Sequence, residues 1–264
     1  MPFTRLNDVV LHWAWRGPAD RPVVVFSNSL GSDFRIWDDV VARLGDRWRI
    51  LLYDKRGHGL SDAPPGPYSI DDHVDDLLAL LDHLGVRRMA MVGLSVGGMI
   101  AQRLAVCAPE SLAALVLCDT AAKIGTAEMW QARIEAVETA GLEPIADAVL
   151  TRWFTPGFFA DEPAAAAGWR NMLARTPAVG YAATSAAIRD ADLTADAPTI
   201  RVPTLCVVGD EDGATPPDLV RGTADLIPGA RFVVIDGAGH LPCIEKPDVL
   251  ATLIDRHLGE AGHG

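Results

Sequence analysis

The stretch Met89–Gly97 reads MAMVGLSVG, an apolar run that leads into a serine with a glycine two residues away on either side. Such runs are typical of strands buried on both faces of a parallel sheet. Residues 99–108 follow with a helical pattern that stops before Pro109. A G-x-S-x-G turn between strand and helix lifts its serine hydroxyl above the sheet, and the helix N-terminus favours negative charge there. Ser95 is therefore the candidate nucleophile.

Strand and helix patterns alternate on both sides of this turn. Further strands are predicted at Val9–Trp15, Pro22–Asn28, Trp48–Tyr53, Leu112–Cys118, Thr204–Val208 and Arg231–Ile235. The first of these alternates in polarity and is predicted to be an edge strand. Ser69 resembles a helix N-cap, the following helix carries one apolar face from Ile70 to Leu84, and Gly85 ends it. With a last helix at Pro247–Leu258, the alternation predicts an α/β fold with a mostly parallel, doubly wound sheet.

The segment 121–198 breaks this alternation. It is rich in alanine, lacks short β-branched runs, and shows helical patterns at Glu128–Ala140 and Pro163–Ala174. We expect this segment to form a helical cap, inserted over one end of the sheet. Residues 1–120 and 199–264 then form the α/β core.

Composition limits the partners and the compartment. The chain has 264 residues and a net charge of −12 at pH 7, so neither nucleic acid nor an anionic membrane is an expected partner. The first residues do not resemble a signal peptide and no run is long enough to span a membrane, so a cytoplasmic enzyme is expected. Nothing in the pattern indicates an oligomeric state. The cysteines form no C-x-x-C pair and are expected to be buried apolar residues rather than zinc ligands: Cys107, Cys118, Cys206 and Cys243.

A serine nucleophile needs a base to take its proton and an acid to orient that base. Two polar clusters, Gly209–Pro216 and Asp236–His240, follow late strands at the sheet edge where sites form in open α/β folds. His240 is the candidate base. Asp212 is the favoured acid because it lies far enough along its loop to curl back under the histidine, whereas Asp210 is expected to brace the loop. The other histidines outside the motifs are expected at the surface: His12, His73, His83, His257 and His263.

The tetrahedral intermediate of such a reaction carries an oxyanion, which needs two backbone donors. One is expected to be the amide of Val96, directly after the nucleophile. The other should come from the loop after the strand that ends near Asn28, and we expect it to be the amide of Leu30.

The loop Tyr53–Ser61 reads YDKRGHGLS and resembles the D-x-R-G-x-G-x-S loop of the α/β-hydrolase-fold family. The clusters Gly209–Pro216 and Gly237–Pro242 also resemble that family's acid and histidine loops, so the resemblance covers essentially the whole chain. It implies an α/β-hydrolase fold with a helical cap. It also implies a structural role for the loop, which leaves three of its residues outside the catalytic set: Asp54, Arg56 and His58.

Within the family, the chain is most similar to 3-oxoadipate enol-lactonases. The similar segments are Phe26–Asp33, where most relatives carry His-Gly at Asn28 and Ser29, then Gly93–Gln102, Trp130, Arg133, Arg152–Pro156 and Asp212–Pro217. The resemblance implies hydrolysis of 3-oxoadipate enol-lactone, in aromatic-compound breakdown through the β-ketoadipate pathway. It implies an acyl-enzyme on one serine and no metal or other cofactor. The glycine-rich turn also lacks the nucleotide-binding patterns G-x-G-x-x-G and G-K-[ST].

Such a lactone carries a free carboxylate, which an arginine fork matches well. Arg133, near Trp130 on a predicted cap helix, is the first candidate to hold it, followed by Lys123 and Arg152. Each of these cations could instead be a solvated helix charge. Trp130 and Trp153 are expected to wall the substrate pocket, with cap-core packing as the alternative.

Other functions on the same fold remain open. A general carboxylesterase, a cofactor-free haloperoxidase-like enzyme or a carbon–carbon bond hydrolase would use the same three catalytic residues. Epoxide hydrolases and haloalkane dehalogenases place aspartate at the position of Ser95 and are disfavoured. A non-catalytic protein of this fold that binds a small molecule would usually lack one of the three residues.

Overall fold

A computed structural model describes residues 2–264. Within these residues, eight strands form a sheet in the order β1-β2-β4-β3-β5-β6-β7-β8. They are β1 (Phe3–Leu6), β2 (Val9–Arg16), β3 (Val23–Ser27), β4 (Arg49–Tyr53), β5 (Met89–Leu94), β6 (Leu112–Cys118), β7 (Thr204–Gly209) and β8 (Arg231–Ile235). From β4 to β8 all neighbours pair in parallel, whereas β2 pairs antiparallel with β1 and β4. The predicted α/β fold with a mostly parallel sheet is confirmed.

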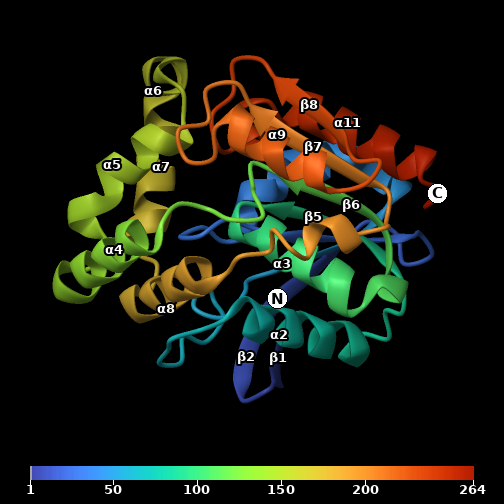
Figure 1. Cartoon of the computed structure of the whole chain (residues 1–264), viewed down its shortest axis with the longest axis horizontal. Coiled ribbons are helices and arrows are strands. Elements are labelled where there is room, and N and C mark those ends of the chain that lie inside the picture. The colour runs from blue at the N-terminus through green and yellow to red at the C-terminus, as the bar shows by residue number, and fades with distance from the viewer. Residues whose placement is uncertain (1) are drawn as a thin grey trace.

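Helices cover both faces of this sheet. The α-helices are α1 (Asp38–Leu44), α2 (Ile70–His83), α3 (Val96–Cys107), α4 (Ala127–Ala140), α5 (Ala146–Trp153), α6 (Pro156–Asp161), α7 (Pro163–Ala174), α8 (Ala178–Asp190), α9 (Pro217–Leu226), α10 (Pro242–Glu245) and α11 (Pro247–Glu260). Short 3-10 turns are η1 (Phe34–Trp37), η2 (Gly45–Arg47), η3 (Pro109–Ser111), η4 (Glu143–Ile145) and η5 (Ala197–Thr199). In Figure 1, α2 and α3 lie side by side in front of the sheet, while α11, which packs against α1, lies behind it.

The central strands explain why the apolar runs are continuous. Every residue of β5, β6 and β7 is buried, because helices cover the sheet on both sides. These strands run in the same direction, so the loops at their carboxyl ends meet at one edge. That edge carries the three candidate catalytic residues.

Helix α2 forms as its sequence predicts. The Ser69 hydroxyl accepts the N–H of Asp72 at 3.1 Å, and the Asp72 carboxylate accepts the N–H of Ser69 at 2.7 Å, so both ends of the capping box are present. Ile70, Val74 and Leu77 lie on the buried face. The helix stops just before Gly85.

Three expectations from the sequence are wrong. The strand at Val9–Trp15 is not at the edge, because β1 pairs outside it; β1 has only four residues, alternately exposed and half-buried, and shows no apolar run. Cys107 is exposed at the end of α3. Only His83 among the five histidines expected at the surface is exposed, whereas the other four lie on inward-facing positions and are buried: His12, His73, His257 and His263.

The helices α4–α8 all lie within the segment predicted as the cap, and Figure 1 shows α4–α7 gathered at one end of the sheet. Two of them, α4 and α7, match the predicted helices, while α5, α6 and α8 were not predicted. Helix α8 packs along α4. The division into a core of residues 1–120 and 199–264 and a cap of residues 121–198 stays a prediction.

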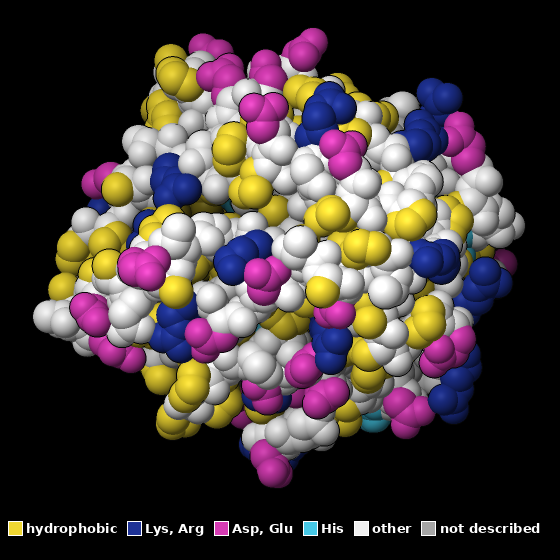
Figure 2. Space-filling model, viewed as in Figure 1, with side chains coloured by type: hydrophobic (Ala, Val, Ile, Leu, Met, Phe, Trp, Pro, Cys, Tyr) yellow, Lys and Arg dark blue, Asp and Glu magenta, His cyan; other side chains and the backbone are white. Residues whose placement is uncertain are grey.

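The surface mixes both signs of charge despite the net charge of −12. Figure 2 shows acidic and basic side chains interspersed over the face seen there, without a large area of one sign. In the described part of the chain, no helix is long and apolar enough to cross a membrane.

Candidate active site

Ser95 lies on the turn between β5 and α3 with φ 57° and ψ −120°, a conformation that side-chain-bearing residues rarely adopt. Two glycines make room for this turn. A methyl group on Gly93 would overlap the carbonyl oxygen of Gly97, and one on Gly97 would overlap the carbonyl oxygen of Ser27. The Ser95 N–H donates to the Cys118 carbonyl of β6 at 3.0 Å. The sharp turn expected from the pentapeptide is therefore present, and neighbouring strands hold its strain.

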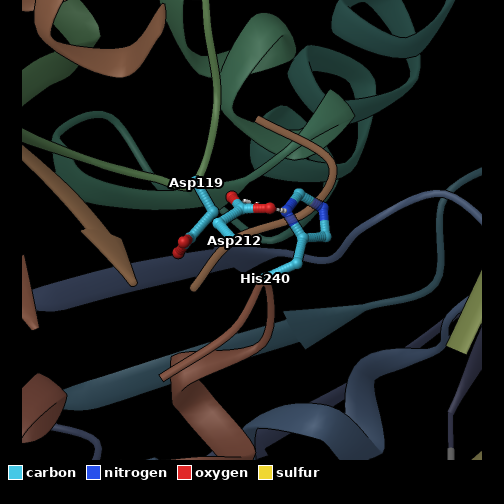
Figure 3. Close-up of side chains that lie close together, drawn as sticks. All are labelled: Asp119, Asp212 and His240. Carbon is cyan, nitrogen blue, oxygen red and sulfur yellow. Dashed lines mark hydrogen bonds and ion pairs between the residues drawn. The ribbon is translucent and has the colours of Figure 1, made fainter. Parts of the chain in front are cut away.

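His240 and Asp212 meet at the carboxyl end of the sheet, from the loops after β8 and β7 (Figure 3). The His240 Nδ1 lies 3.0 Å and 2.9 Å from the two carboxylate oxygens of Asp212. Both side chains are buried. An Nδ1–H that donates to a carboxylate leaves Nε2 free to accept a proton, which is the tautomer a general base needs.

The loop after β7 holds Asp212 as an ionised carboxylate. Its oxygens accept the N–H of Ala214 at 2.7 Å, and the N–H and hydroxyl of Thr215 at 3.0 and 2.6 Å. Burial alone would raise the pKa of Asp212, but the charge of His240 and these hydrogen bonds bring it below its ordinary value. Asp210, expected to brace its own loop, accepts the N–H of Ala238 at 3.2 Å and so links that loop to the His240 loop.

Ser95 and His240 line the same cavity. Among the hydrogen bonds found within residues 2–264, those of the His240 imidazole go to Asp212 and Thr215, not to the Ser95 hydroxyl. Catalytic hydrogen bonds are often long in ligand-free enzymes and tighten when substrate binds. The structure thus brings the candidate base and acid into contact and places the candidate nucleophile at the same cavity.

Asp119 lies beside Asp212, and the sequence reasoning missed it (Figure 3). It follows β6, is fully buried, and its Oδ1 accepts the N–H of Gly209 at 2.9 Å. Its Oδ2 is buried and finds no partner among the described residues. Burial, followed by the charge of Asp212, raises the pKa of the Asp119 carboxyl well above its ordinary value. The position of Asp119 at the carboxyl end of a parallel strand was the signal that could have revealed it.

Asp119, Asp212 and His240 offer donor atoms that all lie within 4.8 Å of one another, a grouping that could in principle hold a metal ion. However, the Nδ1 of His240 and the carboxylate of Asp212 already bond to each other. The contacts of this cluster therefore suit the placement of a proton between imidazole and carboxylate.

Cap residues line the cavity together with Ser95. Trp130, Arg133 and Trp153, all predicted from the sequence to contact substrate, are among them. The indole N–H of Trp130 donates to the Ile124 carbonyl at 2.6 Å, which fixes the ring. Trp153 also acts through its backbone, because its carbonyl accepts the N–H of His240 at 2.8 Å.

Two arginines of the cap line the cavity, and neither forms an ion pair with a carboxylate of residues 2–264. Arg133 donates to the hydroxyl of Tyr181 at 3.1 Å, and the Nε of Arg152 donates to the carbonyl of Gly213 at 2.8 Å. Lys123 does not line the cavity and instead pairs with a surface aspartate at 2.9 Å. Tyr181, on α8, is a cavity residue that sequence reasoning missed.

The two backbone amides predicted to bind an oxyanion are those of Val96 and Leu30. Val96 directly follows Ser95 as the first residue of α3, and Leu30 lines the cavity. Neither N–H donates to an acceptor elsewhere in the described chain. Both amides are therefore available to a ligand oxygen.

Comparisons with known proteins identify the family to which this fold belongs. A family model described as alpha/beta hydrolase fold matches residues 22–247. The 3-oxoadipate enol-lactonase 2 of Acinetobacter baylyi is 40% identical over 94% of this chain and 93% of its own. The crystal structure of the enol-lactonase from Burkholderia xenovorans LB400 has a TM-score of 0.95 and 39% identity, covering 98% of this chain and 100% of that one. A putative non-heme bromoperoxidase of Mycobacterium tuberculosis is 30% identical over 87% of this chain and 90% of its own. The chain therefore belongs to the α/β-hydrolase-fold family.

Proposed function

We propose that this chain hydrolyses a small enol-lactone bearing a free carboxylate, 3-oxoadipate enol-lactone, through an acyl-enzyme on Ser95. The observation that carries the proposal is one cavity lined by a serine on a strained turn and by a histidine bonded to a buried aspartate. Two arginines that form no ion pair with a carboxylate of residues 2–264 line the same cavity. The similarity to enol-lactonases supports this choice of substrate.

The first step forms a bond between the Ser95 oxygen and the lactone carbonyl carbon. His240 accepts the hydroxyl proton at Nε2, and Asp212 stabilises the imidazolium through Nδ1–H. The carbonyl oxygen becomes an oxyanion, which the Leu30 and Val96 amides bind. Removal of one such donor typically costs about 3–4 kcal/mol of transition-state stabilisation.

The second step breaks the ring C–O bond. The enol oxygen leaves with the proton from His240, and it remains tethered because both groups belong to one opened ring. A water molecule, deprotonated by His240, then attacks the Ser95 ester and releases the carboxylate. The enol tautomerises to the ketone, so the overall reaction consumes one water and needs no redox partner.

The carboxylate of the substrate is expected to bind the cap arginines. Arg133 is anchored by one hydrogen bond to Tyr181 and keeps its remaining donors for a ligand. Trp130 and Trp153 line the same space and favour a small, flat ring. The global negative charge would otherwise repel an anionic substrate, so a local cation is needed.

A hydrolysis panel with a Ser95→Ala variant tests the function. The panel compares 3-oxoadipate enol-lactone, a simple γ-lactone and p-nitrophenyl acetate as substrates. We expect a strong preference for the first, a loss of at least about 1,000-fold on all three in the variant, and retained binding of the product. Equal rates on all three substrates would favour a general carboxylesterase, and unchanged turnover in the variant would remove Ser95 from the mechanism.

The role of Arg133 is tested with Arg133→Gln, with Lys123→Met as the matched control outside the cavity. We expect KM for the carboxylated lactone to rise at least tenfold in Arg133→Gln, because a charge-assisted bidentate contact is lost. Hydrolysis of neutral p-nitrophenyl acetate should stay within about threefold, and Lys123→Met should affect neither substrate. Equal losses on both substrates in Arg133→Gln would reject the carboxylate role.

A further inference from the structure

Lys55 is a cationic side chain in the interior, 1% exposed, on the loop after β4. Its Nζ donates to the carbonyl oxygens of Asn28 at 2.9 Å and Ser29 at 2.8 Å, on the loop after β3. In the part of the chain that the structure describes, these carbonyls are its hydrogen-bond partners, and no carboxylate forms an ion pair with it. Burial lowers the pKa of Lys55 to about 7, against the raising effects of Asp54 and Asp33.

His58 makes a second contact between the same two loops. Its Nε2 accepts the N–H of Gly31 at 2.9 Å, and its Nδ1 lies 3.2 Å from the carbonyl of Arg56. These partners fix the neutral tautomer with the proton on Nδ1, and burial, followed by the charge of Lys55, lowers the pKa of His58 well below its ordinary value. Lys55 and His58 therefore hold the backbone immediately before and after Leu30.

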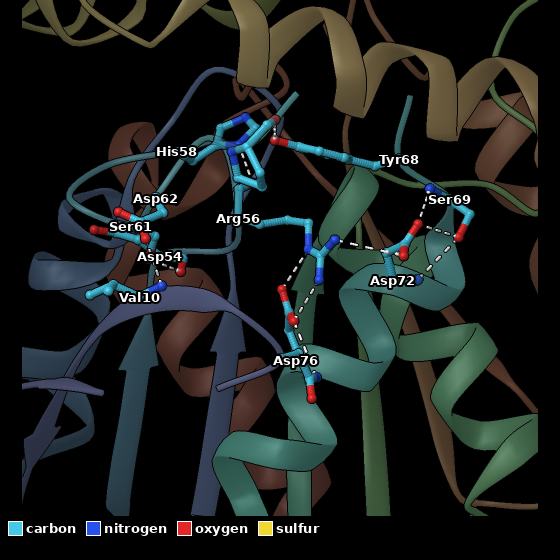
Figure 4. A network of polar contacts seen from close by, with 12 residues as sticks. Val10, Asp54, Arg56, His58, Ser61, Asp62, Tyr68, Ser69, Asp72 and Asp76 are labelled. Atoms are coloured by element: carbon cyan, nitrogen blue, oxygen red, sulfur yellow. Dashed lines mark hydrogen bonds and ion pairs between the residues drawn. The ribbon is translucent and has the colours of Figure 1, made fainter. Parts of the chain in front are cut away.

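The loop that supplies these two side chains is itself anchored on two elements (Figure 4). Arg56 donates to both carboxylate oxygens of Asp76 on α2, at 2.6 and 2.7 Å. At the far end of the loop, Asp62 accepts the N–H of Val10 on β2 at 2.9 Å. The hydroxyl of Ser61 donates to the carbonyl of Asp54 at 2.6 Å and closes the loop on itself. A support fixed in this way can hold a neighbouring backbone still.

We propose that Lys55 is a positioning residue that fixes the backbone of Asn28 and Ser29, so that the Leu30 amide meets the oxyanion of the tetrahedral intermediate. The inference rests on the proposed function, because it concerns the oxyanion that the attack of Ser95 creates. Lys55 is buried and does not line the cavity, so it would act on the reaction through the loop that it holds.

The physical need for such a support follows from how oxyanion donors act. A backbone N–H lowers the barrier only if it already lies 2.7–3.1 Å from the place where the oxyanion forms. The 28–31 loop contains Gly31 at φ 74°, a residue with wide conformational freedom. Without the Lys55 amine, the Asn28 carbonyl would lose its side-chain donor and the Ser29 carbonyl would keep only the donors of Ser32. The Asn28 carbonyl would then turn to find another donor, and the adjoining Leu30 amide would turn with it.

The experiment replaces the amine with a side chain of similar length and no donor, in Lys55→Met. We expect kcat for both the lactone and p-nitrophenyl acetate to fall at least tenfold, within the roughly 1,000-fold limit set by losing one donor. KM and the affinity for the product 3-oxoadipate should stay within about threefold. Phenylboronic acid, whose tetrahedral adduct with a serine places an oxygen in the oxyanion site, should lose affinity by about the same factor as kcat.

A second variant guards against failure to fold. Lys55→Gln keeps two N–H donors on a shorter side chain, so we expect it to restore part of the lost kcat relative to Lys55→Met. The matched control is Thr223→Val, which removes a buried side-chain hydrogen bond to the backbone N–H of Ala122, 3.0 Å long and outside the cavity. The control should leave kcat and boronate affinity unchanged.

The remaining outcomes overturn the inference. Unchanged kcat in Lys55→Met would do so, as would a loss confined to KM or a boronate affinity that does not change with kcat. Failure of both Lys55 variants to fold would make Lys55 a residue of general stability, not of the oxyanion loop. These results are distinguishable from failure of the proposed function, which would appear as an active Ser95→Ala variant. If the lactone is not a substrate, p-nitrophenyl acetate still tests Lys55.

Discussion

Two carboxylates share the buried space beside His240, and their surroundings push their pKa values in opposite directions. Asp212 faces the imidazole and several donors, so its pKa lies below the ordinary value despite burial. Asp119 is buried beside that charge, and within the described chain it accepts a single hydrogen bond, from the Gly209 N–H. Burial and that neighbouring charge hold its pKa well above the ordinary value. The pair therefore carries one negative charge, which is what a single imidazolium needs.

Asp119→Asn tests this division of charge. Folded Asp119 keeps its proton at pH values where the unfolded chain has lost it, so its contribution to stability falls as pH rises above the ordinary pKa of 3.8. An amide cannot ionise, so the variant should gain stability over the wild type with rising pH, by up to about 1.4 kcal/mol per pH unit. Urea unfolding at pH 4, 6 and 8 measures this difference. A difference that does not change with pH would show that Asp119 is ionised in the folded protein.

Among the helices and strands, those with a clear apolar pattern in the sequence were predictable, whereas an element shaped by tertiary packing was not. Strands β6 and β8 begin and end where their apolar runs predict, because short runs bounded by turn residues have few alternatives. Helix α8 was missed because it is buried on nearly all sides against α4 and neighbouring segments, which erases the amphipathic period.

The residues of the candidate site also fall into those that the sequence predicted and those that it did not. Ser95, Asp212 and His240 lie in short loop motifs, and the parallel strands bring the ends of those loops to one edge. Tyr181 carries no motif, and its place at the cavity depends on how α8 packs. Sequence reasoning therefore found the residues that we propose to act on the bond and missed part of the cavity wall beside them.

The close contact between the loop that carries Asp212 and the loop that carries His240 leads to a further prediction. A methyl group on Gly209, the last residue of β7, would overlap the carbonyl oxygens of Ala238 and Gly239 in the His240 loop. Gly209→Ala should force the two loops apart, cost about 1–3 kcal/mol of stability and lower kcat by about 100-fold, since a shift of 1 Å has effects of that size. Urea unfolding measures the change in stability, and p-nitrophenyl acetate hydrolysis measures the change in kcat.

Gly222→Ala is the control for this substitution. Gly222 lies inside α9, and apart from the backbone of its own helix no heavy atom of the described chain lies within 4 Å of an added methyl group. Alanine should therefore stabilise the protein by about 0.5–1 kcal/mol and leave kcat unchanged. If Gly209→Ala behaved like this control, the contact between the two loops would not set the geometry of the His240–Asp212 pair.

The folded protein buries three basic groups on the loop after β4 and on α2, namely Lys55, His58 and His73, and their burial affects how its stability depends on pH. Burial lowers the pKa of His73 to about 3, and burial followed by the Lys55 charge lowers that of His58 well below 6.5. The unfolded chain therefore takes up more protons than the folded one when pH falls below 6.5, and stability is lost in that range. Lys55, at about 7 against 10.5 when unfolded, extends the same trend, because stability rises with pH between those values.

His73→Phe isolates one part of this trend. Both ring nitrogens of His73 are buried and find no hydrogen-bond partner within residues 2–264. The ring packs edge-on against that of Tyr68, with 5.7 Å between the two ring centroids. A phenyl ring of similar size cannot take up a proton and should remove the loss of stability that protonation causes. As pH falls from 6.5 to 3, the free energy of unfolding of the variant should therefore increase relative to that of the wild type, by up to about 1.4 kcal/mol per pH unit. His83→Phe, at the exposed end of the same helix, should show no such gain. Urea unfolding at pH 4, 5, 6 and 8 decides the question, since a constant difference between His73→Phe and the wild type would mean that His73 accepts its proton in the folded protein.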